Sequence, residues 1–218
     1  MGEAELNKKN HKLVIRSVIY CYGDAADQSL AIQIADEIAY SWNEPRQQVR
    51  IRKEWYDVQF EIEGAYAPDL PPAMVWHNTN PRHNFFRIEE FSHHDISFVD
   101  GLGSNTGYLK LGNLLRHSTT AAHEYGHTLG LDHPKQLDIR GKGQPGIMYP
   151  RGTLCDPAFQ YDPAATAGGP GGTLNPFTRK VLCSDIENLK LSSLSFDRQS
   201  LSILGEFSSL YHQKHLSA

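Results

Sequence analysis

The sequence has no run of apolar residues long enough to cross a bilayer. Its 218 residues are 39% hydrophobic, enough to bury a core, but the longest apolar stretches fall far short of the roughly 18 residues of a membrane-spanning helix. Residues 1–12 also contain no apolar stretch of the kind found in signal peptides. We therefore expect no membrane partner, and either a cytoplasmic protein or a secreted form whose leader is missing from this chain.

Basic residues are not in excess, and cysteines are few. The chain has 21 Lys and Arg against 25 Asp and Glu, a formal net charge of −4, which argues against a nucleic-acid partner that needs a basic face. Three cysteines, Cys21, Cys155 and Cys183, cannot form a disulfide framework. Cys155 and Cys183 bracket a Gly- and Pro-rich segment, and either form a disulfide in an oxidising compartment or remain free thiols. A third reading makes Cys155 an inhibitory metal ligand.

The first part of the chain has regular hydrophobic patterns. Strand-like residues occupy 12–22 and 49–62, and between them lies an amphipathic helix that we expect to begin with Asp24 as its cap and to end before Pro45. This strand–helix–strand order predicts a parallel crossover unit. Residues 64–84 contain four prolines and are expected to be a loop.

Short strands and a second helix are expected after this loop. The strands are expected at 85–88, 96–99 and 108–111. Residues 118–130 have a helical pattern, with Ser118 as the expected N-cap and Gly130 as the stop.

The composition changes after this helix. Seven of the twelve prolines and eight of the eighteen glycines lie in 134–178, which predicts a long irregular segment, and such segments are usually functional or mobile. A capping-box pattern at 184–187 predicts a short helix, and apolar spacing predicts another near 197–213. No repeat and no linker divides the chain, so we expect one domain.

The chemistry is concentrated in the stretch HEYGHTLGLDH at 123–133. On a helix His123 and His127 lie on one face, one turn apart, where their imidazoles can bind one zinc ion. Glu124 points sideways, which suits a hydrogen bond to a water molecule on the metal better than ligation. Gly130 allows a positive φ, so the turn can bring His133 back to the zinc as third ligand. Three histidines and a water molecule form the open tetrahedral site that catalysis requires.

This stretch resembles the zinc signature of the metzincin metallopeptidases. Downstream, the sequence GIMYP at 146–150 resembles the methionine turn of that family. Its Met-Tyr-Pro ending, together with 179–189, resembles the matrixin branch in particular. The resemblance implies that Met148 supports the zinc site from below without being a ligand.

The resemblance also implies a fold. It predicts an α+β, zincin-like (metzincin) architecture, with a twisted, mostly parallel sheet, an antiparallel edge strand, an active-site helix and a loop-rich C-terminal subdomain. The chain 1–218 would then be a single catalytic domain. Its upper subdomain, 1–133, would hold the sheet and the zinc helix, and its lower subdomain, 134–218, the methionine turn and C-terminal helices. Substrate would bind by strand addition along an edge strand placed at 107–112.

The function expected from this resemblance is a zinc-dependent endopeptidase. A zinc-bound water, with Glu124 as general base, would hydrolyse peptide bonds of a protein or peptide substrate, and the chain would act as a monomer. Two alternatives remain: a catalytically silent binding protein on a zincin fold, and a metallohydrolase acting on something other than protein.

The chain departs from the patterns of the metzincin branches in two places. His93, Asp95, Asp100 and Gly101 resemble the start of a segment that holds a structural zinc and calcium ions in matrixins, but Tyr108 stands where the next histidine ligand is expected. We therefore expect one catalytic zinc and a solvated loop here, in preference to a second zinc or Ca²⁺. Pro150 stands where astacin-like and serralysin-like relatives have a tyrosine, so a second oxyanion-stabilising group is not identified.

Overall fold

The computed structural model of the protein describes residues 1–114 and 118–216, apart from the side chain of His94. The described strands are β1 (Gly2–Asn7), β2 (Lys12–Tyr22), β3 (Gln48–Ile51), β4 (Glu54–Tyr66), β5 (His83–Glu89), β6 (Phe98–Val99), β7 (Thr106–Lys110) and β8 (Leu201–Leu204). The described α-helices are α1 (Gln28–Asn43), α2 (Pro72–Trp76), α3 (Thr120–Thr128) and α4 (Cys183–Asn188). Single 3₁₀ turns occupy His93–Asp95, Leu111–Asn113, Pro157–Phe159, Pro176–Thr178 and Leu191–Ser193. None of the described helices is long and apolar enough to cross a membrane.

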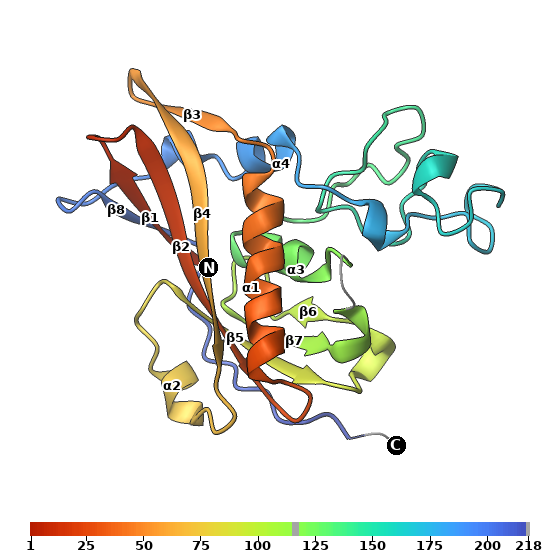
Figure 1. Cartoon of the computed structure of the whole chain (residues 1–218), viewed down its shortest axis with the longest axis horizontal. Coiled ribbons are helices and arrows are strands. Elements are labelled where there is room, and N and C mark those ends of the chain that lie inside the picture. Colours follow the sequence, from red (N-terminus) through yellow and green to blue (C-terminus); the bar gives the residue numbers. More distant parts are fainter. Residues whose placement is uncertain (115–117, 217–218) are drawn as a thin grey trace.

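The strands form one curled, mostly parallel sheet (Figure 1). Its order is β3-β4-β2-β5-β7-β6, and β2, β4, β5 and β7 run parallel to their neighbours in this group. The two outer strands, β3 and β6, are antiparallel to theirs. The expected α+β class and mostly parallel sheet are therefore confirmed at this level.

The edge strand expected at 107–112 is wrong. β7 lies inside the sheet, because β5 pairs with one side of it and β6 with the other through Phe98–Tyr108 and Val99–Gly107. The outermost strand on this side is β6, and it is antiparallel. The order of strands depends on contacts between distant segments, which the local pattern at 107–112 does not contain.

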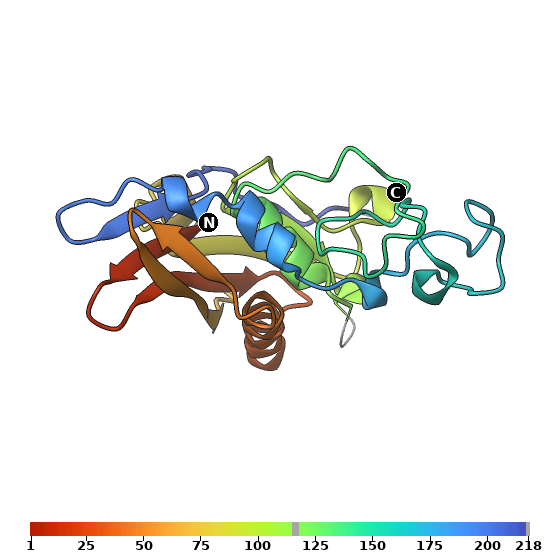
Figure 2. The ribbon, with the colours of Figure 1, turned by 90° about the horizontal axis from the view of Figure 1, so that it is seen from above.

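The long helix α1 begins three residues later than expected. The side chain of Asp27, and not Asp24, accepts a hydrogen bond from the Leu30 backbone N–H at 2.7 Å. The helix packs closely on β4, since a Cβ atom on Gly64 would lie 2.1 Å from the carbonyl oxygen of Ala31. Its buried face consists of Ala31, Ile34, Ala35, Ile38 and Trp42. Figures 1 and 2 both place α1 beside α3, the helix that carries the histidines.

Residues 49–66 form a hairpin where one strand and the start of a loop were expected. The chain turns at Arg52, which has φ 59°, between β3 and β4, and β4 continues to Tyr66. The expected loop 64–84 then contains the short helix α2 before β5 begins. The strands expected near 85–88, 96–99 and 108–111 correspond to β5, β6 and β7, with shifted ends.

The helix expected near 197–213 is wrong. Ser200 and Gly205 have positive φ angles of 65° and 89°, which interrupt a helix, and the residues between them form β8. β8 pairs antiparallel with β1, itself a strand that sequence patterns did not predict. β1 in turn pairs with the half of β2 that β5 leaves free. The unpaired edge of β1 provides β8 with backbone partners that a helix would not use.

The segment expected to be irregular, 134–178, has no α-helix or strand, and this irregular chain continues to residue 182 and extends to one side of the sheet and helices (Figure 1). It has a small core of its own around Ile139, Cys155 and Leu174. The short helix expected there is present, but the capping box expected at 184–187 is wrong, because the N-cap of α4 is Leu182, two residues before Ser184. Asp185 is the side chain that reaches back, and it accepts a hydrogen bond from the Leu182 N–H at 2.8 Å.

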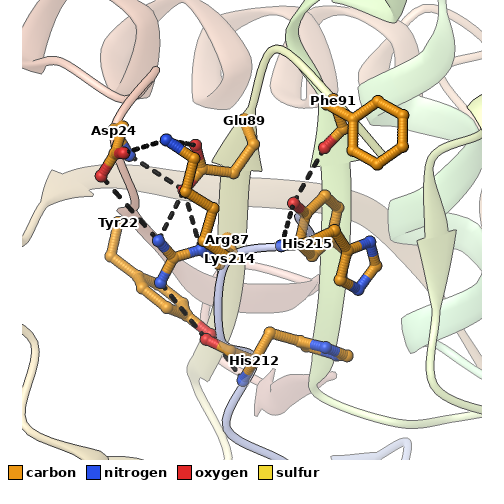
Figure 3. A network of polar contacts seen from close by, with 9 residues as sticks. Tyr22, Asp24, Arg87, Glu89, Phe91, His212, Lys214 and His215 are labelled. Atoms are coloured by element: carbon orange, nitrogen blue, oxygen red, sulfur yellow. Dashed lines mark hydrogen bonds and ion pairs between the residues drawn. The ribbon is translucent and has the colours of Figure 1, made fainter. Parts of the chain in front are cut away.

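The C-terminal segment, residues 205–216, lies against β5 and β7 (Figure 3). The backbone N–H of His212 donates to the Tyr22 hydroxyl at 3.1 Å, and Arg87 donates to the His212 carbonyl oxygen at 3.3 Å. The His212 ring lies 2.8 Å from the Asp100 carboxylate. The C-terminal segment therefore holds the loop that follows β6.

Candidate metal centre

The structure brings His123, His127 and His133 together. One nitrogen of each lies within 4.8 Å of the others, and the Nε2 atom of His133 lies 3.1 Å from the Nε2 atoms of both other rings. α3 places His123 and His127 one turn apart, as predicted. Gly130 has φ 95°, so the helix ends there and the chain returns with His133, which confirms the expected turn. The three histidines could hold a metal ion.

Backbone carbonyl groups fix the tautomer of two of these rings. The Nδ1 atoms of His123 and His127 each lie 2.7 Å from a carbonyl oxygen, of Ile147 and Leu131 respectively. A carbonyl oxygen only accepts, so each Nδ1 carries the proton and each Nε2 presents its lone pair. His133 can donate a proton to at most one of these two lone pairs. A cation at the point of convergence satisfies all three nitrogens.

The spacing and charge state of the rings suit a metal ion. Nitrogen ligands at ~2.0–2.1 Å in a tetrahedral arrangement lie about 3.3–3.4 Å apart, close to the observed 3.1 Å separations. Burial lowers the pKa of all three histidines below the ordinary value, and the Arg179 guanidinium lowers these pKa values further. Neutral imidazole is the form that binds metal.

Glu124 lines the same cavity as the histidines. Its carboxylate does not belong to the set of converging ligand atoms, which come from the three histidines. It is 6% exposed, and no described residue donates a hydrogen bond to its carboxylate. Burial raises the pKa of Glu124 to about 8, while the positive charge of Arg179 opposes this rise. A carboxyl group with free acceptor capacity beside a metal site can accept or donate a proton at neutral pH.

Contacts from three other elements position α3. The Trp42 indole N–H, from α1, donates to the Ala122 carbonyl oxygen at 3.1 Å. The Tyr125 hydroxyl lies 2.8 Å from the Ser17 hydroxyl on β2. Met148, 3% exposed, packs beneath the helix. Met148 therefore packs against Gly126 of α3, and its role as support for a zinc site stays a prediction from the methionine-turn motif. Ser118 accepts from the Thr120 N–H at 3.2 Å, although α3 itself begins at Thr120.

A cavity of about 590 Å³ lies over the histidines. Its lining includes residues between Ile96 and Leu102, among them β6, and residues 150–152. Arg151 and Arg179 also line it. Sequence patterns predicted neither as a site residue, although Arg179 begins the stretch 179–189 that resembles the matrixin branch. The burial of Arg179 results from the meeting of segments distant in the sequence, so it leaves no local sequence signal.

The segment around His93 does not form a second metal centre in the described part of the chain. Asp95 pairs with Lys110, and the His93 ring stacks on His215 with the ring centres 4.2 Å apart. Tyr108 is buried, and its hydroxyl donates to the Phe91 carbonyl oxygen at 2.9 Å. Among the described side chains, the three histidines of α3 and its turn are the one group suited to metal.

The cysteines are not part of the site. Cys155 and Cys183 are both free, the first buried and the second exposed. The Cys155 thiol packs with Ile139 and Leu174, and burial raises its pKa, which disfavours the thiolate that would bind a metal. The inhibitory role considered for Cys155 therefore has no support in this geometry.

A scan against protein-family models finds no match to the sequence, and a search of curated proteins finds none either. The resemblance to the metzincins therefore remains a prediction from motifs. The evidence for a metal site is its geometry: three imidazole nitrogens converge, and a carboxyl group lines the same cavity.

Proposed function

We propose that the chain is a zinc-dependent endopeptidase of the metzincin type. The observation that carries this proposal is the convergence of three Nε2 atoms in the cavity that Glu124 also lines. Three neutral imidazoles in a tetrahedral arrangement favour zinc over the harder cations, which prefer oxygen ligands. Because the three histidines line an open cavity, water and substrate could reach a metal ion that they hold, as a catalytic site requires.

In the proposed hydrolysis, different residues of the site have different roles. Zinc, when bound, supplies a Lewis acid that polarises the scissile carbonyl group and lowers the pKa of water. Glu124 takes a proton from the attacking water and passes it to the leaving amine. The carbonyl groups of Ile147 and Leu131 keep two of the ligand rings in the tautomer that presents Nε2 to the metal.

A peptide is the substrate that the surroundings of the site favour. β6 is the outermost strand of the sheet on this side, and Phe98 and Val99 both line the cavity. An extended peptide can add to such an edge through backbone hydrogen bonds, which would place its carbonyl groups beside the histidines. We propose that one copy of the chain is sufficient, because all four site residues come from the same chain.

The test is Glu124→Gln, measured together with the parent on a broad peptide library and on a denatured protein. The variant keeps the shape of the side chain and removes the base, so it should retain its zinc while cleavage falls by about 10²–10⁴-fold. Glu187→Gln, on the exposed side of α4, is the matched control and should cleave like the parent.

Two results would count against the proposal. Loss of zinc from Glu124→Gln would make Glu124 a ligand instead of the base. A parent that carries zinc and cleaves neither the library nor the denatured protein would favour the silent binding protein.

A further inference from the structure

Arg179 is a buried cation without a carboxylate partner. It is 6% exposed, lines the cavity, and forms none of the ion pairs seen among the described residues. Its guanidinium donates from Nε to the Thr119 hydroxyl at 3.1 Å and from Nη1 to the Tyr149 carbonyl oxygen at 3.0 Å. Both acceptors are uncharged. Glu124 acts on this positive charge electrostatically, but among the described residues no carboxylate forms an ion pair with it.

Some N–H groups of the Arg179 guanidinium have no acceptor among the described residues. Its Nη1 atom also lies 2.9 Å from Nδ1 of His123, but this Nδ1 already carries the proton that it donates to Ile147. That contact is therefore between two donors. The Nη2 group of Arg179 donates to no described residue. An arginine that is nine-tenths buried beside an open cavity, with unused N–H groups, is suited to bind an oxyanion.

A second arginine lines the same cavity. Arg151 follows Pro150, and its Nη2 donates to the side-chain oxygen of Asn113 at 3.0 Å, across the end of the cavity. Burial lowers the pKa of the Arg179 guanidinium to about 10; the Glu124 carboxylate opposes this shift, and the charge of Arg151 adds to it. Arg151 is exposed, so it can reorient toward a ligand. The carboxyl groups that line the same cavity, Glu124 and Asp132, form no ion pair with either arginine.

The position of Arg179 relative to the histidines indicates which part of a substrate it meets. It contacts the Nδ1 edge of His123, whereas the three rings converge at their Nε2 atoms. The guanidinium is thus separated from the metal position by an imidazole ring. Arg179 therefore lies outside the point where the rings converge, so the substrate group that it can meet is one next to the reacting carbonyl group along an extended peptide.

We infer that Arg179 and Arg151 form a subsite for a carboxylate group of the substrate, adjacent to the bond that is cleaved. The carboxylate comes either from an Asp or Glu side chain or from the C-terminus of a short peptide. The inference rests on the proposed function and adds a substrate class to it. Arginine recognises carboxylates through two parallel N–H···O bonds, and a substrate without the carboxylate leaves the buried charge unpaired.

The first experiment compares substrates on the parent enzyme. Peptides that differ only by Glu or Gln are made at each of the positions flanking the cut, and a second set differs by a free or amidated C-terminus. The expected result is that Glu at one flanking position raises kcat/KM roughly 10- to 100-fold over Gln, the range for hydrogen bonds to a charged group. A preference for the free C-terminus over the amide would identify the terminal carboxylate as the source instead.

The second experiment measures binding without cleavage. Zinc-loaded Glu124→Gln is titrated with the fluorescently labelled Glu and Gln peptides, and anisotropy gives their Kd values. The Glu peptide should bind at least tenfold more tightly. Equal Kd values, together with equal cleavage of both peptides by the parent, would overturn the subsite and leave the proposed function intact. A parent that cleaves nothing would overturn the proposed function, and the anisotropy titration would still decide whether the carboxylate subsite exists.

Variants assign the effect to the two arginines. Arg179→Gln should abolish the preference for Glu, and thermal unfolding shows whether this buried substitution is tolerated. Arg151 is exposed, so Arg151→Glu should not disturb core packing. This variant should lower the ratio of Glu-peptide to Gln-peptide cleavage and should raise cleavage of a Lys peptide. Arg140→Gln lies on an exposed loop outside the cavity and is the matched control. An unchanged ratio in both Arg179→Gln and Arg151→Glu would overturn the assignment.

Discussion

The Nδ1 atom of His123 lies 2.7 Å from the carbonyl oxygen of Ile147, so a metal-site side chain itself joins α3 to the segment that carries Met148. Ile147 also contacts α4. The Ile147 N–H donates to the Asp185 carboxylate at 3.3 Å, at the start of α4. A chain of contacts therefore runs from the metal position to a helix outside the cavity.

This chain of contacts predicts the effect of Asp185→Ala. Asp185 is 6% exposed and accepts from the N–H groups of Ile147 and Leu182, which the substitution leaves unpaired. We expect a loss of about 1–3 kcal/mol in the free energy of unfolding, measured by denaturant titration, and weaker zinc binding. Glu187→Ala, on the exposed side of the same helix, should change neither quantity. Unaltered zinc affinity in Asp185→Ala would show that Ile147 keeps its position without α4.

Gly126→Ala tests the packing beneath α3. A Cβ atom at this position would lie 2.4 Å from Met148 Sδ and 3.2 Å from Trp42 Cζ2. Alanine improves helix propensity by about 1 kcal/mol, but overpacking a core typically costs about 1–3 kcal/mol, so we expect a lower melting temperature. Gly152→Ala, which meets no atom within 4 Å, is the control. A higher melting temperature in Gly126→Ala would mean that Met148 moves aside without cost.

His133→Ala tests the third ligand and the metal count. We expect the parent to hold one zinc per chain by elemental analysis, and the variant to lose most of it while circular dichroism shows the helices unchanged. His77→Ala, an exposed histidine after α2, should retain the full zinc content. Full zinc content in His133→Ala would point to Asp132 as the ligand. A count near two in the parent would instead restore the second metal site near His93.

Removing the metal should lower stability without unfolding the chain. Zinc at 100 times its Kd stabilises a folded state by about 2.7 kcal/mol if the unfolded chain does not bind it. The main core lies between the sheet, α1 and α3 and does not depend on the metal. A chelator should therefore lower the melting temperature while the far-ultraviolet spectrum at room temperature stays native. Unfolding at room temperature would show that the fold itself requires zinc.

The features that sequence patterns predicted correctly are those set by local geometry. His123 and His127 meet because four residues make about one helical turn, and His133 returns because Gly130 can adopt φ 95°. These relations depend only on the eleven residues 123–133. The three-histidine group could therefore be predicted before any fold was known.

The features that sequence patterns missed depend on segments far apart in the chain. Leu201 and Leu204 recur at a spacing that also suits a helix, and only the free edge of β1 makes this segment a strand. The position of β7 inside the sheet depends likewise on β6 pairing with it. Arg179 is buried because Thr119 and Tyr149 meet around it.

The contacts of His215 predict how stability depends on pH. Its Nδ1 atom accepts the His93 backbone N–H at 3.1 Å, and its ring stacks on Tyr108 with the centres 4.0 Å apart. Protonation of Nδ1 would break the first contact. Burial, followed by repulsion from His93, His212 and Arg87, lowers the pKa of His215 below the ordinary 6.5, while Glu89 opposes this shift. Lys214 adds another cation to the same segment (Figure 3).

The sign of the effect follows from this lowered pKa. The unfolded chain binds a proton at His215 more readily than the folded chain does, so stability rises with pH through this range. The contribution is present above about pH 6.5, the ordinary value, and is lost as the pH falls below it. We therefore expect the melting temperature of the parent to fall more between pH 7.5 and about pH 5 than that of His215→Gln, which cannot titrate. His77→Gln should follow the parent. Parallel curves for the parent and His215→Gln would show that the C-terminal segment stays docked when His215 is protonated.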